Sequence, residues 1–195
     1  MSEPTLILIT GYARSGKDTL AEGIMSGISS KTRWAYKRAF ADTLKEAANE
    51  YVRQLGLDGD GNDFYSEPFK VRNRRFLVEA GMFARSLDVD VFAACFAKKC
   101  LDFASSHGPG LIVAADWRYL NELRFCQKWL HDRSGWRIVT VEVNTAGVGP
   151  ANEEEGMSIA EIRRQVSPDI TFTFSPDNAQ LIKAEGKNLA RQLGL

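Results

Sequence analysis

Gly11-Tyr-Ala-Arg-Ser-Gly16-Lys17-Asp18-Thr19 is the stretch that decides the fold of this chain. It follows Thr5-Leu-Ile-Leu-Ile-Thr10, a short and continuously apolar run that is typical of a strand buried on both faces. A turn from a strand into a helix gathers backbone N–H groups at the positive end of the helix dipole, where they can hold an oligophosphate. The two glycines permit the curl and Lys17 can reach the phosphates, so the stretch predicts a phosphate-binding loop.

The loop matches the spacing GxxxxGK with one departure. The position after the lysine, where a serine or threonine usually contacts the metal, holds Asp18, and Thr19 comes one residue later. In this arrangement we expect Thr19 to contact phosphate or metal, and Asp18 to hold a magnesium-bound water. The competing interpretation is an ordinary strand-to-helix turn whose lysine is solvated.

Composition indicates one globular domain. The chain has 195 residues, of which 44% are hydrophobic and 26% charged, which is enough for one sizeable core. Basic and acidic residues cancel at 25 each, so no overall field favours a long nucleic acid. A small anionic substrate fits this balance better than a polymer.

The cysteines and the apolar runs favour a cytoplasmic protein. Cys95, Cys100 and Cys126 are an odd number, and the first two lie in an apolar helical pattern, which predicts reduced thiols. No run approaches the roughly 18 apolar residues of a membrane span. The first apolar run lacks the flanks of a signal peptide and is better interpreted as a strand.

Strand and helix signals alternate along the chain. Further strands are expected at Arg33–Phe40, Leu111–Ala115, Trp136–Val143 and Asp169–Phe174. Helices are expected at Thr43–Leu55, Asp88–Phe103 and Asp177–Leu193, with one more whose apolar stripe is Phe76, Ala80, Phe83 and Leu87. This alternation predicts an α/β three-layer domain with a mostly parallel sheet of about five strands flanked by helices.

Two aspartates follow expected strands. Asp42 is interpreted equally well as a helix N-cap or as a substrate contact. Asp116 comes directly after a buried strand, where an aspartate can position magnesium through water or cap the next helix. The carboxyl ends of parallel strands share one edge of a sheet, so Gly11, Asp42 and Asp116 should meet there. Arg118, Asn121 and Glu122 follow and are candidates for the same cleft.

The densest group of arginines is a candidate second anion site. Arg72, Arg75 and Glu79 are spaced i, i+3 and i+7 on a predicted helix. A charge run is usually a solvated face. A phosphate-binding protein needs a second anion site, however, and guanidinium groups bind phosphate with two parallel hydrogen bonds.

Residues 144–156 form a segment rich in glycine, proline and acids, without a period. It is interpreted either as a mobile lid or as a long surface loop. Ser158-Ile-Ala-Glu161 matches a capping box that would open a short helix carrying Arg163 and Arg164.

Three segments together resemble the bacteriophage deoxynucleoside monophosphate kinases. They are the loop GYARSGKDT, Phe40-Ala-Asp-Thr-Leu-Lys45 and Ala115-Asp-Trp-Arg-Tyr-Leu-Asn-Glu122. The same segments are similar to a looser group of kinases that includes phosphomevalonate kinase. The chain departs from the family pattern at Met157-Ser-Ile-Ala-Glu161, which lacks the histidine of a His-x-Ser-Glu motif.

The resemblance implies an adenylate-kinase-like P-loop kinase fold that uses ATP and Mg²⁺ to phosphorylate a deoxynucleoside monophosphate. The implied ATP-binding residues are Gly11, Ala13, Arg14, Ser15, Gly16, Lys17, Asp18 and Thr19. The implied acceptor contacts are Asp42, Lys45, Arg72, Arg75, Glu79, Arg118, Asn121 and Glu122. The residues expected to hold the metal are Asp18, Thr19 and Asp116. The expected catalytic residues are Lys17, Arg14 and Asp116.

We therefore expect a single kinase domain over residues 1–195, with a helical substrate-binding insertion at about 57–105 and a lid at about 144–166 that carries Arg163 and Arg164. We expect its partner to be a small nucleotide and not a membrane, and its location to be cytoplasmic, or the host cytoplasm if the chain is phage-encoded. The sequence leaves a homodimer open.

Two other functions stay open at this stage. The first is a kinase that phosphorylates a hydroxyl, such as a hydroxymethylated base in DNA or a small alcohol, with Asp42 or Asp116 as the base. Nucleic acid would be a partner only in that case. The second is a P-loop ATPase or switch module that hydrolyses ATP without an acceptor.

Overall fold

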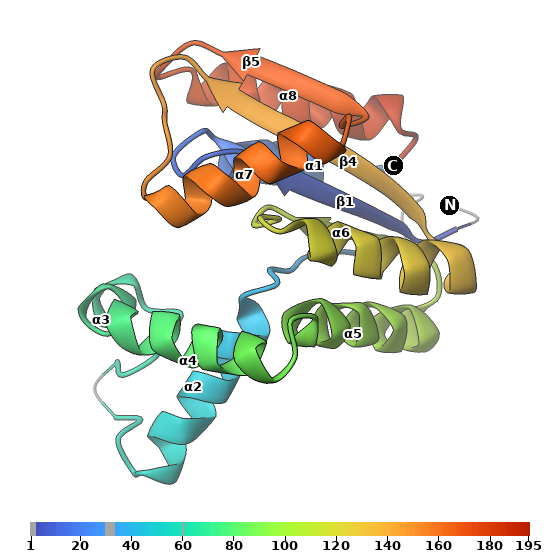
Figure 1. Cartoon of the computed structure of the whole chain (residues 1–195). Coiled ribbons are helices and arrows are strands. Elements are labelled where there is room, and N and C mark those ends of the chain that lie inside the picture. Colours follow the sequence, from blue (N-terminus) through green and yellow to red (C-terminus); the bar gives the residue numbers. More distant parts are fainter. Residues whose placement is uncertain (1–2, 30–33, 60) are drawn as a thin grey trace.

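The computed structural model describes residues 3–29, 34–59 and 61–195 and shows helices on both faces of one sheet (Figure 1). The strands are β1 (Thr5–Thr10), β2 (Ala35–Lys37), β3 (Leu111–Ala114), β4 (Arg137–Thr145) and β5 (Ile170–Phe174). The helices are α1 (Lys17–Gly27), α2 (Asp42–Gln54), α3 (Glu67–Arg72), α4 (Arg74–Leu87), α5 (Val91–His107), α6 (Leu120–Cys126), the π-helical turn η1 (Gln127–Asp132), α7 (Glu153–Gln165) and α8 (Ala179–Gln192).

The five strands are all parallel, in the order β2-β3-β1-β4-β5. Thr5 of β1 is paired with Leu111 on one side and with Arg137 on the other. Because the strands run in one direction, the segments that follow them meet at one edge of the sheet. The predicted α/β architecture with a parallel sheet of five strands is confirmed.

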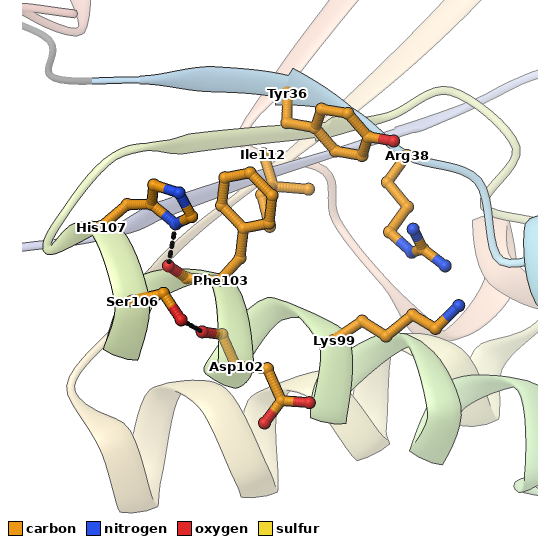
Figure 2. A pocket seen from close by; sticks show the side chains of 8 residues that line it. All are labelled: Tyr36, Arg38, Lys99, Asp102, Phe103, Ser106, His107 and Ile112. Atoms are coloured by element: carbon orange, nitrogen blue, oxygen red, sulfur yellow. Dashed lines mark hydrogen bonds between the residues drawn. The ribbon is translucent and has the colours of Figure 1, made fainter.

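A pocket of about 270 Å³ opens beside the edge strand β2 (Figure 2). Tyr36 of β2 stacks on Phe103 of α5, with ring centroids 5.5 Å apart. Arg38 and Lys99 lie on the other side, and both form ion pairs with Glu46. No loop residue from Gly11 to Thr19 lines this pocket, so it is separate from the predicted phosphate site.

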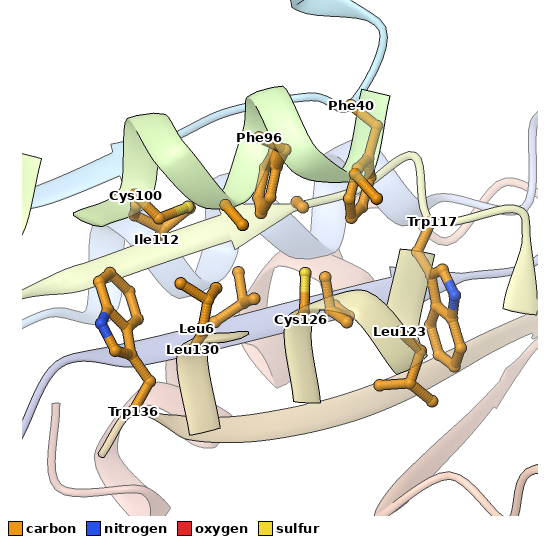
Figure 3. Close-up of a cluster of buried hydrophobic side chains, with 14 of the residues drawn as sticks. Leu6, Phe40, Phe96, Cys100, Ile112, Trp117, Leu123, Cys126, Leu130 and Trp136 are labelled. Carbon is orange, nitrogen blue, oxygen red and sulfur yellow. The ribbon is translucent and has the colours of Figure 1, made fainter. Parts of the chain in front are cut away.

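Alternate side chains of β1 enter two different cores. Leu6 and Leu8 face a cluster with α5, α6 and α7, which Figure 3 shows around Phe96 and Cys126. Ile7 and Ile9 face a second cluster with α1 and α8. Every residue of β1 is buried, as its continuous apolar run predicts. The cysteines are all free, in agreement with the predicted thiols.

Helices α2, α3 and α4 stand apart from the sheet and share a small core of their own (Figure 1). The predicted apolar stripe of α4 is a core face only in its first part. Phe76 stacks on Phe64 of the small core and on Tyr51 of α2, with ring centroids 5.7 and 5.9 Å apart. Phe83 and Leu87 are 65% and 73% exposed, so the prediction is wrong for this end of the stripe. A neighbouring face of the helix also packs there, with Leu77 against the small core and Gly81 close to Leu44 of α2.

Two predicted boundaries also differ from the structure. Helix α7 begins before the predicted capping box: its N-cap is Asn152, whose Oδ1 accepts the N–H of Glu155 at 2.8 Å. Ser158 lies inside the helix, and its hydroxyl donates to a backbone carbonyl one turn earlier. Strand β2 is shorter than predicted, and Arg33 lies outside the described residues. Within the described part of the chain, no helix is long and apolar enough to cross a membrane.

Helices α1 and α8 approach each other through glycine. A Cβ added to Gly186 would lie 2.4 Å from the carbonyl oxygen of Leu20 and 2.8 Å from the Cα of Gly23. No side chain fits between backbones at that distance, so any larger residue must push the two helices apart.

We therefore expect Gly186→Ala to lower the free energy of unfolding by about 1–3 kcal/mol, measured by urea denaturation, because the two helices must separate. Gly59→Ala is the matched control, since a Cβ there meets nothing within 4 Å. Equal stability of the two variants would contradict the close approach.

Candidate functional site

The loop between β1 and α1 has the curled backbone that its sequence predicts. Gly11 and Gly16 have φ values of 138° and 89°, and Arg14 has a φ of 65°. A Cβ on Gly11 would lie 2.2 Å from the carbonyl oxygen of Val143, so only glycine fits against the end of β4. Thr145 of the same strand donates its hydroxyl to the carbonyl of Ser15 at 3.0 Å. The loop is therefore seated on β4 as well as between β1 and α1.

Lys17 folds back over this loop. Its ammonium donates to the carbonyls of Gly11 at 2.7 Å and Tyr12 at 2.6 Å. Burial, and then the nearby charge of Arg118, lower the pKa of Lys17 to about 8, although the Glu155 carboxylate acts in the opposite direction. A buried cation with a lowered pKa gains most from an additional anion, which is the property that a phosphate site requires.

Asp116, which follows β3, and Asp42, the first residue of α2, both accept backbone N–H groups near the ends of the strands. The Asp116 carboxylate accepts the N–H groups of Phe40 at 3.0 Å and Ala41 at 3.1 Å, which ties the end of β3 to the turn before α2. Burial raises the pKa of Asp116, and these two hydrogen bonds oppose the rise. Asp42 accepts the N–H of Ala39 and binds Lys45 at 3.2 Å. The sequence prediction that Gly11, Asp42 and Asp116 share an edge agrees with this arrangement.

Of the three candidates Arg118, Asn121 and Glu122, Arg118 is the one that extends toward the loop between β1 and α1. Glu122 is buried and accepts the N–H groups of Arg118 and Tyr119, and burial, then Asp116, raise its pKa to about 8. Asn121 donates to the carbonyl of Val89. Arg118 extends toward the loop instead, and its charge acts on Lys17. Glu122 therefore shapes the turn that presents Arg118.

Glu155 is the site residue that the sequence did not reveal. Its Oε1 accepts the N–H of Ala13 in the loop at 3.1 Å and lies 3.4 Å from a guanidinium nitrogen of Arg118. Its Oε2 accepts the N–H of Ala151 at 2.8 Å. Burial alone would raise the pKa of Glu155, but these hydrogen bonds and Arg118 outweigh it and lower the pKa. The carboxylate is therefore charged and sits among the cations of the loop.

The arginines predicted for the lid have different surroundings. Arg163 binds Glu142 at 2.6 Å and Asn144 at 2.7 Å, and its guanidinium lies over the ring of Tyr12, 4.8 Å from the centroid. Arg164 is exposed. Arg163 thus joins α7 to the end of β4 and to the loop.

The arginine group on the helical insertion is not brought to the loop. Arg75 is 91% exposed in its side chain and binds Glu79 at 2.7 Å, and Arg72 is exposed at the end of α3. Nearer the sheet edge, Lys45 lies over the ring of Tyr65, 5.2 Å from its centroid. Lys45, Arg72 and Arg75 belong to α2, α3 and α4, and Figure 1 shows these helices on the other side of the sheet from α7.

The residues expected to hold the metal, Asp18, Thr19 and Asp116, carry oxygen atoms and lie at the start of α1 and just after β3. Asp18 is exposed and forms an ion pair with Lys37 at 2.6 Å. Thr19 follows in the first turn of α1. Among the described residues, no group of three or more His, Cys, Asp or Glu side chains is close enough to hold a metal ion.

Comparisons with known proteins support the fold. No protein-family model and no curated protein sequence matches the chain. Among solved structures, a putative kinase from Chloroflexus aurantiacus J-10-fl has a TM-score of 0.51 at 16% identity, over 100% of this chain and 98% of that one. Two structures of the Mycobacterium tuberculosis APS kinase CysC cover 100% of both chains. The Cys556Ala mutant has a TM-score of 0.42 at 18% identity, and the complex with AMPPNP and APS has 0.43 at 16%. The likeness to the Chloroflexus protein extends over the whole chain, so the two share a fold.

Proposed function

We propose that this protein transfers the γ-phosphoryl group of ATP to a deoxynucleoside monophosphate and releases the diphosphate. The observation that carries the proposal is Lys17, a buried cation on a glycine-rich turn between a strand and a helix, with Arg118 beside it. A loop of this kind suits a triphosphate, and the cations of the insertion suit a second phosphate.

ATP would be held mainly by backbone. Backbone N–H groups of the loop and the dipole of α1 would supply a cradle for the β- and γ-phosphates, and Lys17 would supply the charge. Arg14, at its positive φ, projects from the same turn. The donors near α1 suit Mg²⁺, which binds oxygen ligands and usually relies on one or two carboxylates plus substrate phosphates. Asp18, Thr19 and Asp116 would hold that ion, which neutralises the charge of the transferring phosphoryl group when bound.

The acceptor would bind between the sheet edge and the insertion. Lys45 and Asp42 at the start of α2 would contact it first. Helices α3 and α4 would then move toward the sheet and complete the site, with contacts from Arg72, Arg75, Glu79 and Asn121. A monophosphate is already an anion, so the transfer needs positioning and charge neutralisation more than a base. Both oxygens of Asp116 already accept backbone N–H groups, which suits a structural role better than that of a base.

A panel of acceptors tests the proposal. The protein is incubated with labelled ATP and, separately, with deoxynucleoside monophosphates, ribonucleoside monophosphates, hydroxymethylated DNA or no acceptor. The proposal expects labelled diphosphate only with monophosphates. Label on DNA alone would favour a hydroxyl kinase, and turnover that ignores every acceptor would favour an ATPase or switch.

Lys17→Ala should reduce kcat for phosphoryl transfer by about 100-fold or more, because the variant loses the loop's charge at the transferring group. Lys98→Ala on the exposed face of α5 is the control and should keep full activity. The measurement is diphosphate formation at saturating ATP. Normal activity of Lys17→Ala would contradict the role of the loop.

ATP affinity should fall as the pH rises through about 8, because only the protonated form of Lys17 attracts phosphate and its pKa is about 8. Above that pKa, the Kd should rise and then level off at the value for neutral Lys17, because the backbone N–H groups still bind the phosphates. Lys17→Arg keeps its charge at these pH values and should give a nearly flat profile. Calorimetric titration at several pH values measures both, and parallel profiles would contradict the assignment.

Arg75→Ala should raise KM for the monophosphate by about tenfold and leave KM for ATP unchanged, since a charge-assisted contact with phosphate contributes about 1.5–3 kcal/mol. Arg191→Ala, on the last turn of α8, is the matched arginine control. If both KM values stay unchanged in Arg75→Ala, the arginine is only a solvated side chain.

A further inference from the structure

Glu155 has a position that its role in the helix does not explain. Its side chain is 2% exposed, although it lies in the first turn of α7 between residues at the surface. The N-cap of this helix is already provided by Asn152, and only one oxygen of Glu155 serves the local turn, through the N–H of Ala151. The other oxygen reaches Ala13, 142 residues away in the sequence.

The groups that hold this oxygen are of the kind that hold phosphate. They are a backbone N–H of the phosphate-binding loop and the guanidinium of Arg118, with the ammonium of Lys17 close enough to act on both. Carboxylate and phosphate oxygens accept from the same donors, and an anion in such a loop needs no other explanation. The Glu155 carboxylate is therefore an anion that belongs to the protein itself and occupies donors of the loop.

A second anion at the same donors must displace the first. A triphosphate carries more charge than a carboxylate and would compete for the N–H of Ala13 and for Arg118, while Glu155 would repel it at short range. Helix α7 follows the turn at residues 146–152, which is exposed over most of its length. The start of the helix can therefore move and carry the Glu155 carboxylate away from the loop. Figure 1 shows α7 starting at the same sheet edge as the loop.

We propose that the Glu155 carboxylate is a built-in occupant of the phosphate site, which an incoming oligophosphate displaces together with the start of α7. Arg118 then passes from Glu155 to the phosphate. The contact of Glu155 with Ala13 and Arg118 is therefore autoinhibitory, because it lowers the affinity of the protein for nucleotide. This inference rests on the proposed function only in that the loop binds phosphate, and it is independent of the acceptor.

The test uses inorganic tripolyphosphate, which has no base or sugar, and the full chain. Calorimetric titration compares wild type with Glu155→Gln, which keeps the size and one acceptor oxygen but loses the charge. Removal of the occupant should lower the Kd by about tenfold or more, because a competing state no longer reduces the fraction of open sites. Glu153→Gln removes a charge from the same helical turn at an exposed position and should bind like wild type.

Hydrogen exchange of the wild-type protein gives a second readout that does not depend on a variant. The amides of Ala13 and Ala151 both donate to Glu155. On binding tripolyphosphate, Ala151 should lose protection while Ala13 keeps it, because phosphate replaces the carboxylate only at the loop. A Kd that is unchanged or higher in Glu155→Gln, or increased protection of Ala151, would overturn the inference.

The two proposals fail in different ways. If tripolyphosphate binds more tightly to Glu155→Gln but no monophosphate is phosphorylated by wild type, the built-in occupant stands and the kinase assignment fails. If phosphoryl transfer occurs and Glu155→Gln binds tripolyphosphate no better, the occupant fails alone. If neither protein binds tripolyphosphate, both are wrong.

Discussion

The parallel pairing of β1 with β3 on one side and β4 on the other is the constraint on which the structure depends. It buries both faces of β1, so the residues of that strand must be apolar, and it brings the chain that follows each strand to one edge. Gly11 comes from β1, Asp116 from β3 and Asn144 from β4. Segments far apart in the sequence thereby meet at one edge of the sheet, and the three cysteines, which are free, take no part in holding them there.

At that edge, carboxylates secure the backbone. Asp116 accepts two N–H groups from the turn before α2, Glu122 accepts two from the turn before α6, and Glu155 accepts one from the loop and one from its own turn. Buried N–H groups in turns need such partners, because no neighbouring strand supplies them. Glu155 forms an ion pair with Arg118, and the carboxylates of Glu155 and Asp116 favour the charged form of Lys17, which partly offsets the burial of its ammonium.

The sequence predicts the part of the structure that local patterns determine. Continuous apolar runs identify β1 and β3, and the glycine and lysine spacing identifies the loop, because these depend on neighbours in the chain. The prediction fails for Phe83 and Leu87 of α4, because helical periodicity reveals an apolar face but not what covers it. Glu155 could not be found, since its partners are set by tertiary structure and it lies in an acidic run that resembles a solvated surface. The capping box at Ser158 failed for a related reason: Asn152 caps the helix earlier.

The central claim is that the loop recognises phosphates through backbone and Lys17, with the base contributing little. The most direct measurement is the Kd of ATP and of adenosine for the same protein, by calorimetric titration at neutral pH. The account predicts that ATP binds at least about 100-fold more tightly, a difference of about 2.7 kcal/mol. Equal affinity for ATP and adenosine would show that the loop does not hold phosphate and would contradict the account.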